Sequence, residues 1–280
     1  MPRTASKINL FTYLDYRKFL KDWYTQAKKE RSSFSFRVFS KRAGFESPNF
    51  FKLVMDGKRN LTAKSLPKFI VGLKLNKQEQ EFFQSLVAYT QASTHEEKDE
   101  HYRKLLQSKK FNKIKPVDKD CYDFYGHWYH SVVRELVTHK DFDGSPDWVA
   151  NRVFPPINAK QVEKSIELLE KLGFIEKTSN KRYKQTDSLL TTGDELAALV
   201  FLNYHQNMLA LTKQTLPYVS AKRRDVSSLT LGVSRERVDQ IKLKIKEFRK
   251  EILKLVADDK EPEEVVFVNI QMLPATKESV

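Results

Sequence analysis

One stretch of the chain, residues 35–62, constrains the fold more than any other, because its pattern indicates two short helices joined by a tight turn. In a helix that begins near Ser35, apolar residues at positions 36, 39 and 43 share one face and the cations look outward. Gly44 favours the left-handed conformation that ends a helix, and Ser47-Pro48 is typical of a helix start. The pattern therefore predicts a second helix over residues 47–55.

The second helix is expected to pack Phe51 and Val54 against the first, which leaves a polar and cationic face free. This is the outline of a helix-turn-helix, whose second helix enters a DNA major groove. An amide suits adenine and an ammonium suits guanine, so Asn49 and Lys52 are expected at base edges. The cations flanking them are expected at phosphates. The candidate DNA-binding residues are Lys41, Arg42, Ser47, Asn49, Phe50, Lys52, Lys58, Arg59 and Asn60.

The segments FSKRAG, SPNFFKLV and DGKRNLT resemble, in this order, the DNA-binding domain of Cro and phage repressors. Two departures are one extra residue in the turn, at Phe45-Glu46, and Ser40 where that family has alanine. With INLFTYLDYRKFL near the start and a long C-terminal part, the chain is similar to a family of paralogous bacterial predicted transcriptional regulators. The resemblance implies DNA binding, and that family's C-terminal domain is of unknown function.

Aromatic residues are dense around this motif, with phenylalanine at positions 34, 36, 39, 45, 50 and 51. Such rings can stack on nucleic-acid bases, but rings at helical spacing more often form a core. We therefore expect all of them to be buried except Phe50.

Charge is distributed unevenly along the chain. The net charge is +14; residues 1–90 hold 18 Lys+Arg against 7 Asp+Glu, or +11, which leaves 32 against 29, or +3, for residues 91–280. A cationic domain gains free energy by releasing counterions from DNA. Surface lysines that merely favour solubility are the alternative explanation, but the asymmetry favours nucleic acid.

The remaining composition narrows the class of protein. The 280 residues are enough for two or three domains, and a single cysteine, Cys121, excludes an internal disulfide. No stretch resembles a signal peptide or a membrane span, so we expect a cytoplasmic protein with no membrane partner. With eight glycines and no phosphate loop, HExxH, CxxC or GxSxG motif, we expect neither an enzyme nor a cofactor.

We expect a mainly α fold with a small α/β part, divided into four regions. Residues 1–92 form the helix-turn-helix bundle and residues 93–118 a helical, basic linker. Residues 119–190 have a winged-helix layout, in which a helix from Asn158 to Leu172 precedes a hairpin around Ser179-Asn180. The mixed charges of that helix favour a packing or dimer role over DNA contact. Residues 191–280 form a helical and strand-helix-strand domain for dimerisation or sensing.

A helix expected over residues 119–139 carries Cys121, Asp123, His127 and His130, whose spacing would let three of them share a face. This is a weak pattern for a metal site, because histidines on a helix are more often ordinary, partly buried residues. We expect no metal.

In the last region, the segments VSSLTLGV and VVFVNIQML are expected to be strands on either side of a long helix capped by Ser234. Apolar residues recur along that helix at a 3,4,3,4,3 spacing, which is the seam of a coiled coil. The helix either contacts a second copy or lies on a sheet. The apolar residues are Val238, Ile241, Ile245, Phe248, Ile252 and Leu255.

The chain is therefore expected to be a homodimeric, sequence-specific regulator that binds double-stranded DNA. The alternative is an interaction or scaffold protein that uses its C-terminal domain, while the basic bundle binds nucleic acid non-specifically or meets an acidic partner. The operator, the direction of regulation and any effector leave no pattern in the residues.

Overall fold

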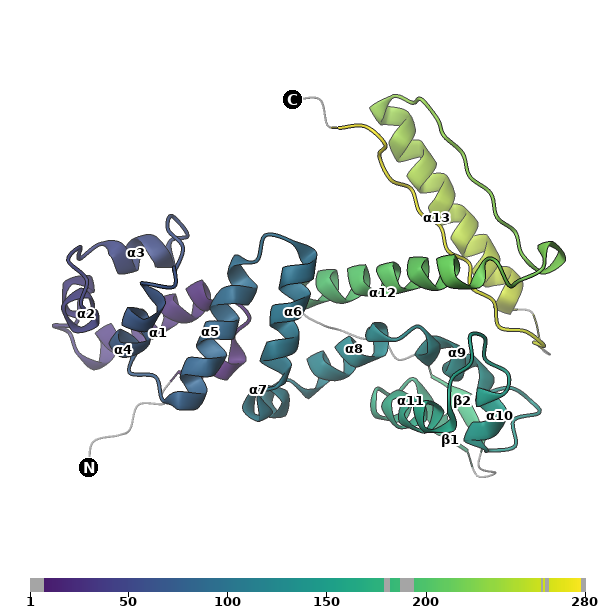
Figure 1. Cartoon of the computed structure of the whole chain (residues 1–280), viewed down its shortest axis with the longest axis horizontal. Coiled ribbons are helices and arrows are strands. Elements are labelled where there is room, and N and C mark those ends of the chain that lie inside the picture. Colours follow the sequence, from purple (N-terminus) through teal and green to yellow (C-terminus); the bar gives the residue numbers. More distant parts are fainter. Residues whose placement is uncertain (1–7, 179–181, 187–193, 258, 260–261, 278–280) are drawn as a thin grey trace. The chain divides into compact units, whose positions relative to one another are not determined.

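The computed structural model describes residues 8–178, 182–186, 194–257, 259 and 262–277 (Figure 1). It is mainly helical, with one small antiparallel sheet in the described part of the chain. The fold class expected from the sequence, mainly α with a small α/β part, is confirmed. None of the described helices is both long and apolar enough to cross a membrane. The chain divides into two compact units, Met1–Tyr122 with Thr192–Leu199, and Asp123–Thr191 with Val200–Val280.

The first unit is a bundle of short helices. A 3₁₀ turn precedes them. Four of the helices start after a residue whose side chain accepts a hydrogen bond from a free backbone amide, namely Asp15, Ser35, Asn76 and Thr94. Asn76 and Thr94 form capping boxes with Glu79 and Glu97. The elements are η1 (Leu10–Thr12), α1 (Tyr16–Glu30), α2 (Phe36–Ala43), α3 (Phe50–Met55), α4 (Leu66–Leu73), α5 (Lys77–Gln91), α6 (His95–Leu106) and α7 (Lys109–Ile114).

Aromatic rings hold α1 to α4 together. Phe39 and Phe51 are fully buried with ring centroids 4.3 Å apart, and Phe51 stacks on Phe69 of α4 at 5.5 Å. Trp23 of α1 lies against Phe34, Phe39 and Phe51. Burying several rings stabilises a small bundle strongly, since each contributes several kcal/mol when it is removed from water.

Residues 93–118 are not a linker in the structure. They form α6, α7 and the start of α8 (Pro116–Gly126). Helix α6 packs with α5, and α7 packs with α6 and η1 and reaches α5 through the Phe82–Phe111 ring contact. Tyr102, Leu105 and Phe111 of this stretch are fully buried. The charged composition that indicated a linker belongs to the exposed faces of these helices, whereas three apolar side chains at helical spacing were enough to fold them into the first unit.

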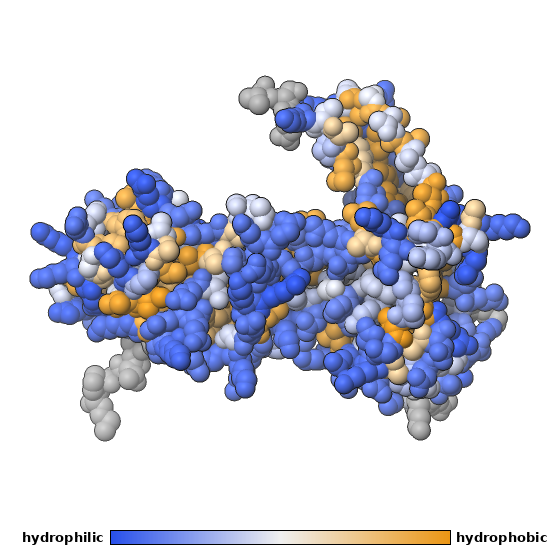
Figure 2. Space-filling view, in the orientation of Figure 1, coloured by the Kyte–Doolittle hydropathy of each residue, from blue (hydrophilic) through white to orange (hydrophobic). Residues whose placement is uncertain are grey.

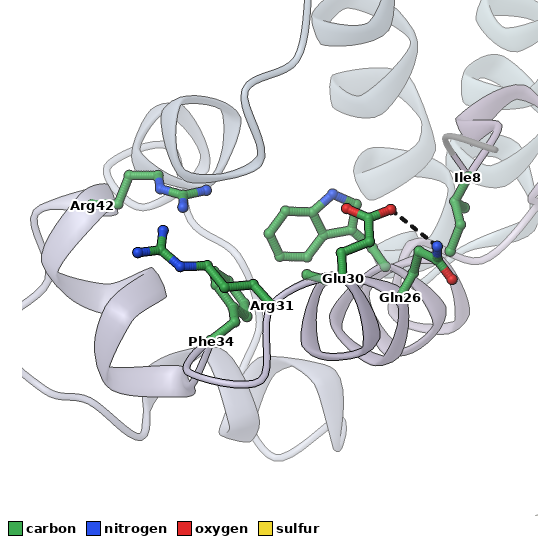
Figure 3. A pocket seen from close by; sticks show the side chains of 8 residues that line it. Ile8, Gln26, Glu30, Arg31, Phe34 and Arg42 are labelled. Carbon is green, nitrogen blue, oxygen red and sulfur yellow. Dashed lines mark hydrogen bonds between the residues drawn. The ribbon is translucent and has the colours of Figure 1, made fainter. Parts of the chain in front are cut away.

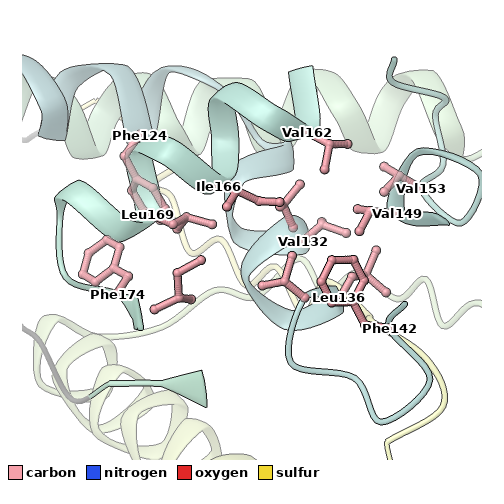
Figure 4. Close-up of a cluster of buried hydrophobic side chains, with 13 residues drawn as sticks. Phe124, Val132, Leu136, Phe142, Val149, Val153, Val162, Ile166, Leu169 and Phe174 are labelled. Atoms are coloured by element: carbon pink, nitrogen blue, oxygen red, sulfur yellow. The ribbon is translucent and has the colours of Figure 1, made fainter. Parts of the chain in front are cut away.

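The second unit has a separate apolar core, formed by α9 (Tyr129–Leu136), α10 (Pro146–Ala150), α11 (Ala159–Lys171) and the strands β1 (Ile175–Lys177) and β2 (Tyr183–Gln185). Figure 4 shows this core between α9 and α11. Its members are Phe124, Val132, Val133, Leu136, Val137, Phe142, Val149, Val153, Val162, Ile166, Leu169, Phe174 and Ile175.

Three helices, α9 to α11, are followed by an antiparallel hairpin, so the helix from Asn158 and the hairpin after it are present, and the winged-helix assignment stays a prediction. Ile175 pairs with Gln185 and Lys177 with Tyr183, and Asn158 starts α11 with a capping box. The predicted turn at Ser179-Asn180 lies outside the described residues. Lys184 on β2 forms an ion pair with Glu176 on β1, so this cation of the hairpin already has a partner.

The helix expected over residues 119–139 is in fact two helices. Its first part ends at Gly126 and α9 begins at Tyr129. The Gly126 carbonyl accepts a hydrogen bond of 2.9 Å from the Asn207 side chain. A carbonyl at the end of a helix needs such an outside partner. The periodicity was helical throughout, and the carbonyl at the break is satisfied by a residue 81 positions away.

The expected strand-helix-strand unit is wrong in its strands. A helix, α12 (Asp194–Thr215), a 3₁₀ turn, η2 (Ala221–Arg223), and a long helix, α13 (Arg235–Ala257), are present, but residues 226–233 and 265–273 form no strand. A strand exists only when a neighbouring strand accepts and donates its backbone hydrogen bonds. These two segments flank α13 (Figure 1) and make no backbone hydrogen bonds to one another.

Candidate nucleic-acid interface

The turn between α2 and α3 is fixed by one backbone conformation and two hydrogen bonds. Gly44 ends α2 at φ 69°, the left-handed conformation that glycine adopts without strain. Lys68 of α4 donates a hydrogen bond of 2.8 Å to the Gly44 carbonyl. The buried Ser40 hydroxyl donates to the Pro48 carbonyl at 3.3 Å. The serine that departs from the repressor pattern therefore ties the far end of the turn to α2.

The second helix starts later than the sequence indicated. The prediction placed its first residue at Ser47, but α3 begins at Phe50, with Asn49 before it and no side-chain cap. The amide of Phe50 instead reaches the Ser47 carbonyl at 3.5 Å, so residues 47–50 form a turn. Ser47 is exposed and does not cap the helix. The longer turn leaves α3 with six residues.

The two faces of α3 have opposite characters. Phe51 and Val54 are fully buried against the bundle. Asn49 and Lys52 are exposed and stand three residues apart, on one face of a helix. The structure therefore places the two residues expected at base edges together on the solvent side of α3.

Phe50 does not stand free. It is half-buried, with its ring 4.9 Å from Phe45 and 6.1 Å from Phe69. Lys68 lies over the Phe45 ring at 5.2 Å. This ring holds the turn against α4, so the structure gives Phe50 a packing role where the sequence suggested base stacking.

The loop after α3 is held at both ends. The amides of Lys58 and Arg59 both donate to the Leu53 carbonyl, at 2.9 and 3.1 Å, which folds the loop back on the helix. The Gln91 side chain of α5 pairs with both backbone groups of Leu61, at 2.8 and 2.9 Å. Arg17 of α1 donates to the Asn60 side chain at 2.6 Å. Loop backbone and helix therefore form one ordered surface.

A buried hydroxyl strengthens this anchor. Tyr16 of α1 donates a hydrogen bond of 2.8 Å to the side-chain amide oxygen of Gln91. Burial raises the pKa of Tyr16 to about 12, so the hydroxyl stays protonated and keeps donating over the physiological range. The position of the loop thus depends on α1 and α5 as well as on α3.

Cations dominate the surface of this motif. Residues 36–60 contain six Lys+Arg and two Asp+Glu, Glu46 and Asp56. Lys41, Lys58 and Arg59 are exposed, and none has a carboxylate within ion-pair distance among the described residues. Unpaired cations on an ordered loop can meet phosphates without first breaking an ion pair.

Arg42 differs from the other predicted phosphate contacts. Its guanidinium donates to the Gly72 carbonyl of α4 at 3.3 Å and lies 5.5 Å from the Phe34 ring. Figure 3 shows it beside Arg31 in a small pocket of about 220 Å³. Arg42 is half-buried there and holds α2 to α4.

Sequence reasoning missed the residues that shape this surface from other helices. Ser40, Lys68, Gln91 and Arg17 each bond to the turn or the loop. The one available signal was Gly44, since carbonyls at the end of a helix attract cations. The lysine that reaches Gly44 is set by the packing of α4, which the spacing of apolar residues in the sequence does not predict.

The cysteine and histidines considered as metal ligands do not come together at one site. Cys121 is fully buried, and burial raises the pKa of its thiol to about 11. His130 is buried with its Nδ1 atom 2.7 Å from the Ser165 hydroxyl, whereas His127 is exposed. Within the part of the chain that the structure describes, no three His, Cys, Asp or Glu side chains lie close enough to hold a metal ion.

The described fold is thus mainly helical and has two units, and the first unit carries two short helices, α2 and α3, joined by a turn and flanked by cations. A family model described as Domain of unknown function (DUF4423) matches residues 108–275, and the chain belongs to this family. The matched residues begin at the N-cap of α7, after the basic motif. No curated protein and no solved structure matches the chain.

Proposed function

We propose that this protein is a transcriptional regulator that binds double-stranded DNA as a homodimer through α2, α3 and the loop after α3. Asn49 and Lys52 meet base edges in the major groove, and Lys41, Lys58 and Arg59 contact phosphates. The observation that carries the proposal is the ordered loop of unpaired cations beside the exposed polar face of α3.

The charge of the first unit supports the proposal. Residues 1–90 carry +11 of the chain's +14, and the motif itself lies within them. A domain with so many cations releases counterions when it binds DNA, which makes the free energy of binding more favourable whatever the DNA sequence. A short helix with two polar residues outward adds the sequence-dependent part.

The proposal is tested by selecting genomic DNA fragments with the purified protein at near-physiological salt. The test variant is Lys58→Ala with Arg59→Ala. Its matched control is Lys28→Ala with Lys29→Ala, which removes the same charge from exposed positions at the end of α1. We expect a short palindromic motif for the wild type and the control. We expect the test variant to lose affinity for all sequences and to lower the slope of log K against log salt by about 2.

A substitution at a base contact should act differently. Asn49→Ala is expected to relax the preference at one base pair, worth about 1–3 kcal/mol, and to leave the salt slope unchanged. Equal DNA binding by the wild type and the Lys58/Arg59 variant would refute the proposal. If no fragment is retained, the basic bundle meets an acidic protein instead.

A further inference from the structure

The C-terminal part of the second unit has no core of its own. From Ala221 to Lys277, no described residue is buried, although the stretch contains the 23-residue helix α13. Fifteen of the 24 exposed large apolar side chains in the described chain lie between Val226 and Leu273. Figure 2 shows apolar side chains gathered over α13 and the segments beside it.

The amount of exposed apolar surface is that of a protein interface. A large apolar side chain offers on the order of 100 Å². Without Leu243, which lies outside the seam of α13, the other fourteen are 37–84 % exposed and together offer on the order of 800 Å². Stable interfaces bury about 800 Å² per partner, and a monomer seldom exposes an apolar patch of this size. The surface is therefore expected to be covered.

A groove in this surface opens onto the apolar seam of α13. It measures about 850 Å³ and is lined by Ile241, Ile245 and Phe248 of α13, with Val233 and Ile270 from the two flanking segments. Phe248 is 50 % exposed. The seam expected from the heptad spacing thus faces an open groove, not a sheet.

We infer that the occupant of this groove is α13 of a second copy of the chain, packed antiparallel. The seam spacing is self-complementary: an antiparallel pair places Val238 opposite Leu255, Ile241 opposite Ile252, and Ile245 opposite Phe248 of the second copy. The bulky Phe248 then meets isoleucine on both sides of the two-fold axis and never another Phe248.

The charges beside the seam favour the same direction. In a parallel pair, Arg237 would face Lys242 and Lys244 would face Arg249 of the second copy, which repel. In the antiparallel pair, Arg237 faces Glu251 of the second copy, and this contact occurs twice. Two like-charge contacts disfavour the antiparallel pair: at the two-fold axis, Lys244 faces Lys244 of the second copy, and Arg249 faces Arg249. Lys244 is already neutralised by Glu247, 2.9 Å away on the same helix.

The flanking segments gain from the same interface. Residues 226–233 and 265–273 are apolar, extended and without backbone hydrogen bonds to protein in the described chain. One end is anchored, because Val265 packs on the core of the second unit and Phe267 lies 6.1 Å from Trp128. A second copy provides the partner that these segments lack.

This inference deepens the proposed function and rests on its dimeric form, but it is tested without DNA. The mass of the full chain is measured by light scattering at micromolar concentration. The wild type should have twice the mass of one chain, and Ile245→Lys, in the seam, should be a monomer. Leu243→Lys is the matched control, because Leu243 is 60 % exposed and lies outside the seam and the groove. It should remain a dimer.

The register of the two helices is tested with a short bis-maleimide cross-linker. The cysteines replace exposed residues, so the substitutions are not expected to disturb folding. Lys244→Cys should cross-link to itself across the axis. Arg237→Cys alone should not, but it should cross-link when mixed with Glu251→Cys. The native Cys121 is fully buried and gives little background.

A monomeric wild type, or dissociation of the Leu243 variant as complete as that of the Ile245 variant, would overturn the inference. So would self-cross-linking of Arg237→Cys without that of Lys244→Cys. If the cross-links form as expected and no DNA is bound, the dimer stands and the proposed function fails.

Discussion

At the scale of single residues, the second unit contains a buried histidine that the proposed function does not use. His130 is 4 % exposed, and its Nδ1 atom lies 2.7 Å from the hydroxyl of Ser165, which is fully buried on α11. Burial, with a contribution from the nearby His127, lowers the pKa of His130 from 6.5 to about 4. The imidazole therefore stays neutral inside the core and links α9 to α11.

This lowered pKa predicts how stability varies with pH. Between about pH 4 and 6.5 the unfolded chain binds a proton at His130 and the folded chain does not, so stability rises with pH across this window. The full difference is about 3 kcal/mol. Chemical denaturation of the wild type and of His130→Gln at pH 4.5 and pH 7 measures it.

We expect the variant to lose most of the wild type's change in stability between the two pH values. His127→Gln is the control, because His127 is exposed and its loss should leave most of that change in place. An equal pH dependence in the wild type and His130→Gln would contradict the account.

At the scale of elements, the closeness of α2 and α4 depends on a glycine in the last turn of α4. A Cβ atom on Gly72 would lie 2.6 Å from Cζ of Phe39 and 3.0 Å from the Cβ of Ala43. The Phe39 ring cannot easily move, because Phe51 and Phe69 contact it at 4.3 and 5.3 Å. Gly72 therefore sets how tightly α4 supports the helix-turn-helix.

We predict that Gly72→Ala destabilises the first unit by about 1–2 kcal/mol. Alanine would by itself favour the helix by about 1 kcal/mol, but overpacking a tight core costs about 1–3 kcal/mol and wins here. Gly126→Ala is the control, since a Cβ at Gly126 meets nothing within 4 Å. Urea denaturation measures the free energy of unfolding of both variants. If Gly72→Ala is as stable as the wild type, the predicted clash with Phe39 does not occur.

At the scale of the whole molecule, the proposed function links two distant parts of the sequence. The proposed DNA-binding surface lies within residues 36–60, and the proposed dimer contact lies within residues 226–273. One helix-turn-helix reads few base pairs, and two on a symmetric site read twice as many. Dimerisation then makes the binding of the second half-site intramolecular, which raises affinity without any new DNA contact.

The linked prediction concerns operators with one or two half-sites. Ile245→Lys should bind a single half-site as the wild type does, and should bind the two-half-site operator on the order of 100-fold more weakly. Fluorescence anisotropy with both DNAs measures this, with Leu243→Lys expected to behave as the wild type. Equal loss on a single half-site would show that the substitution harms the first unit.

The sequence alone determined the local structure of this protein. Caps and apolar periodicity indicated α5, α6, α11 and α13, and glycine at position 44 marked the end of α2, because these features depend on neighbours within a few residues. The seam of α13 and the cationic character of residues 36–60 were visible for the same reason. The candidate site could be outlined from it, with Asn49 and Lys52 on one exposed face.

Tertiary structure decided what depends on distant partners. Residues 93–118 fold into the first unit because their apolar faces find α5, and the helix after them breaks where Asn207 reaches Gly126. Arg42 and Phe50 were expected at DNA, but in the structure they pack against α4, which lies beside them. Residues 226–233 and 265–273 have the composition of strands, but a strand needs a hydrogen-bonding neighbour, and the described chain provides none.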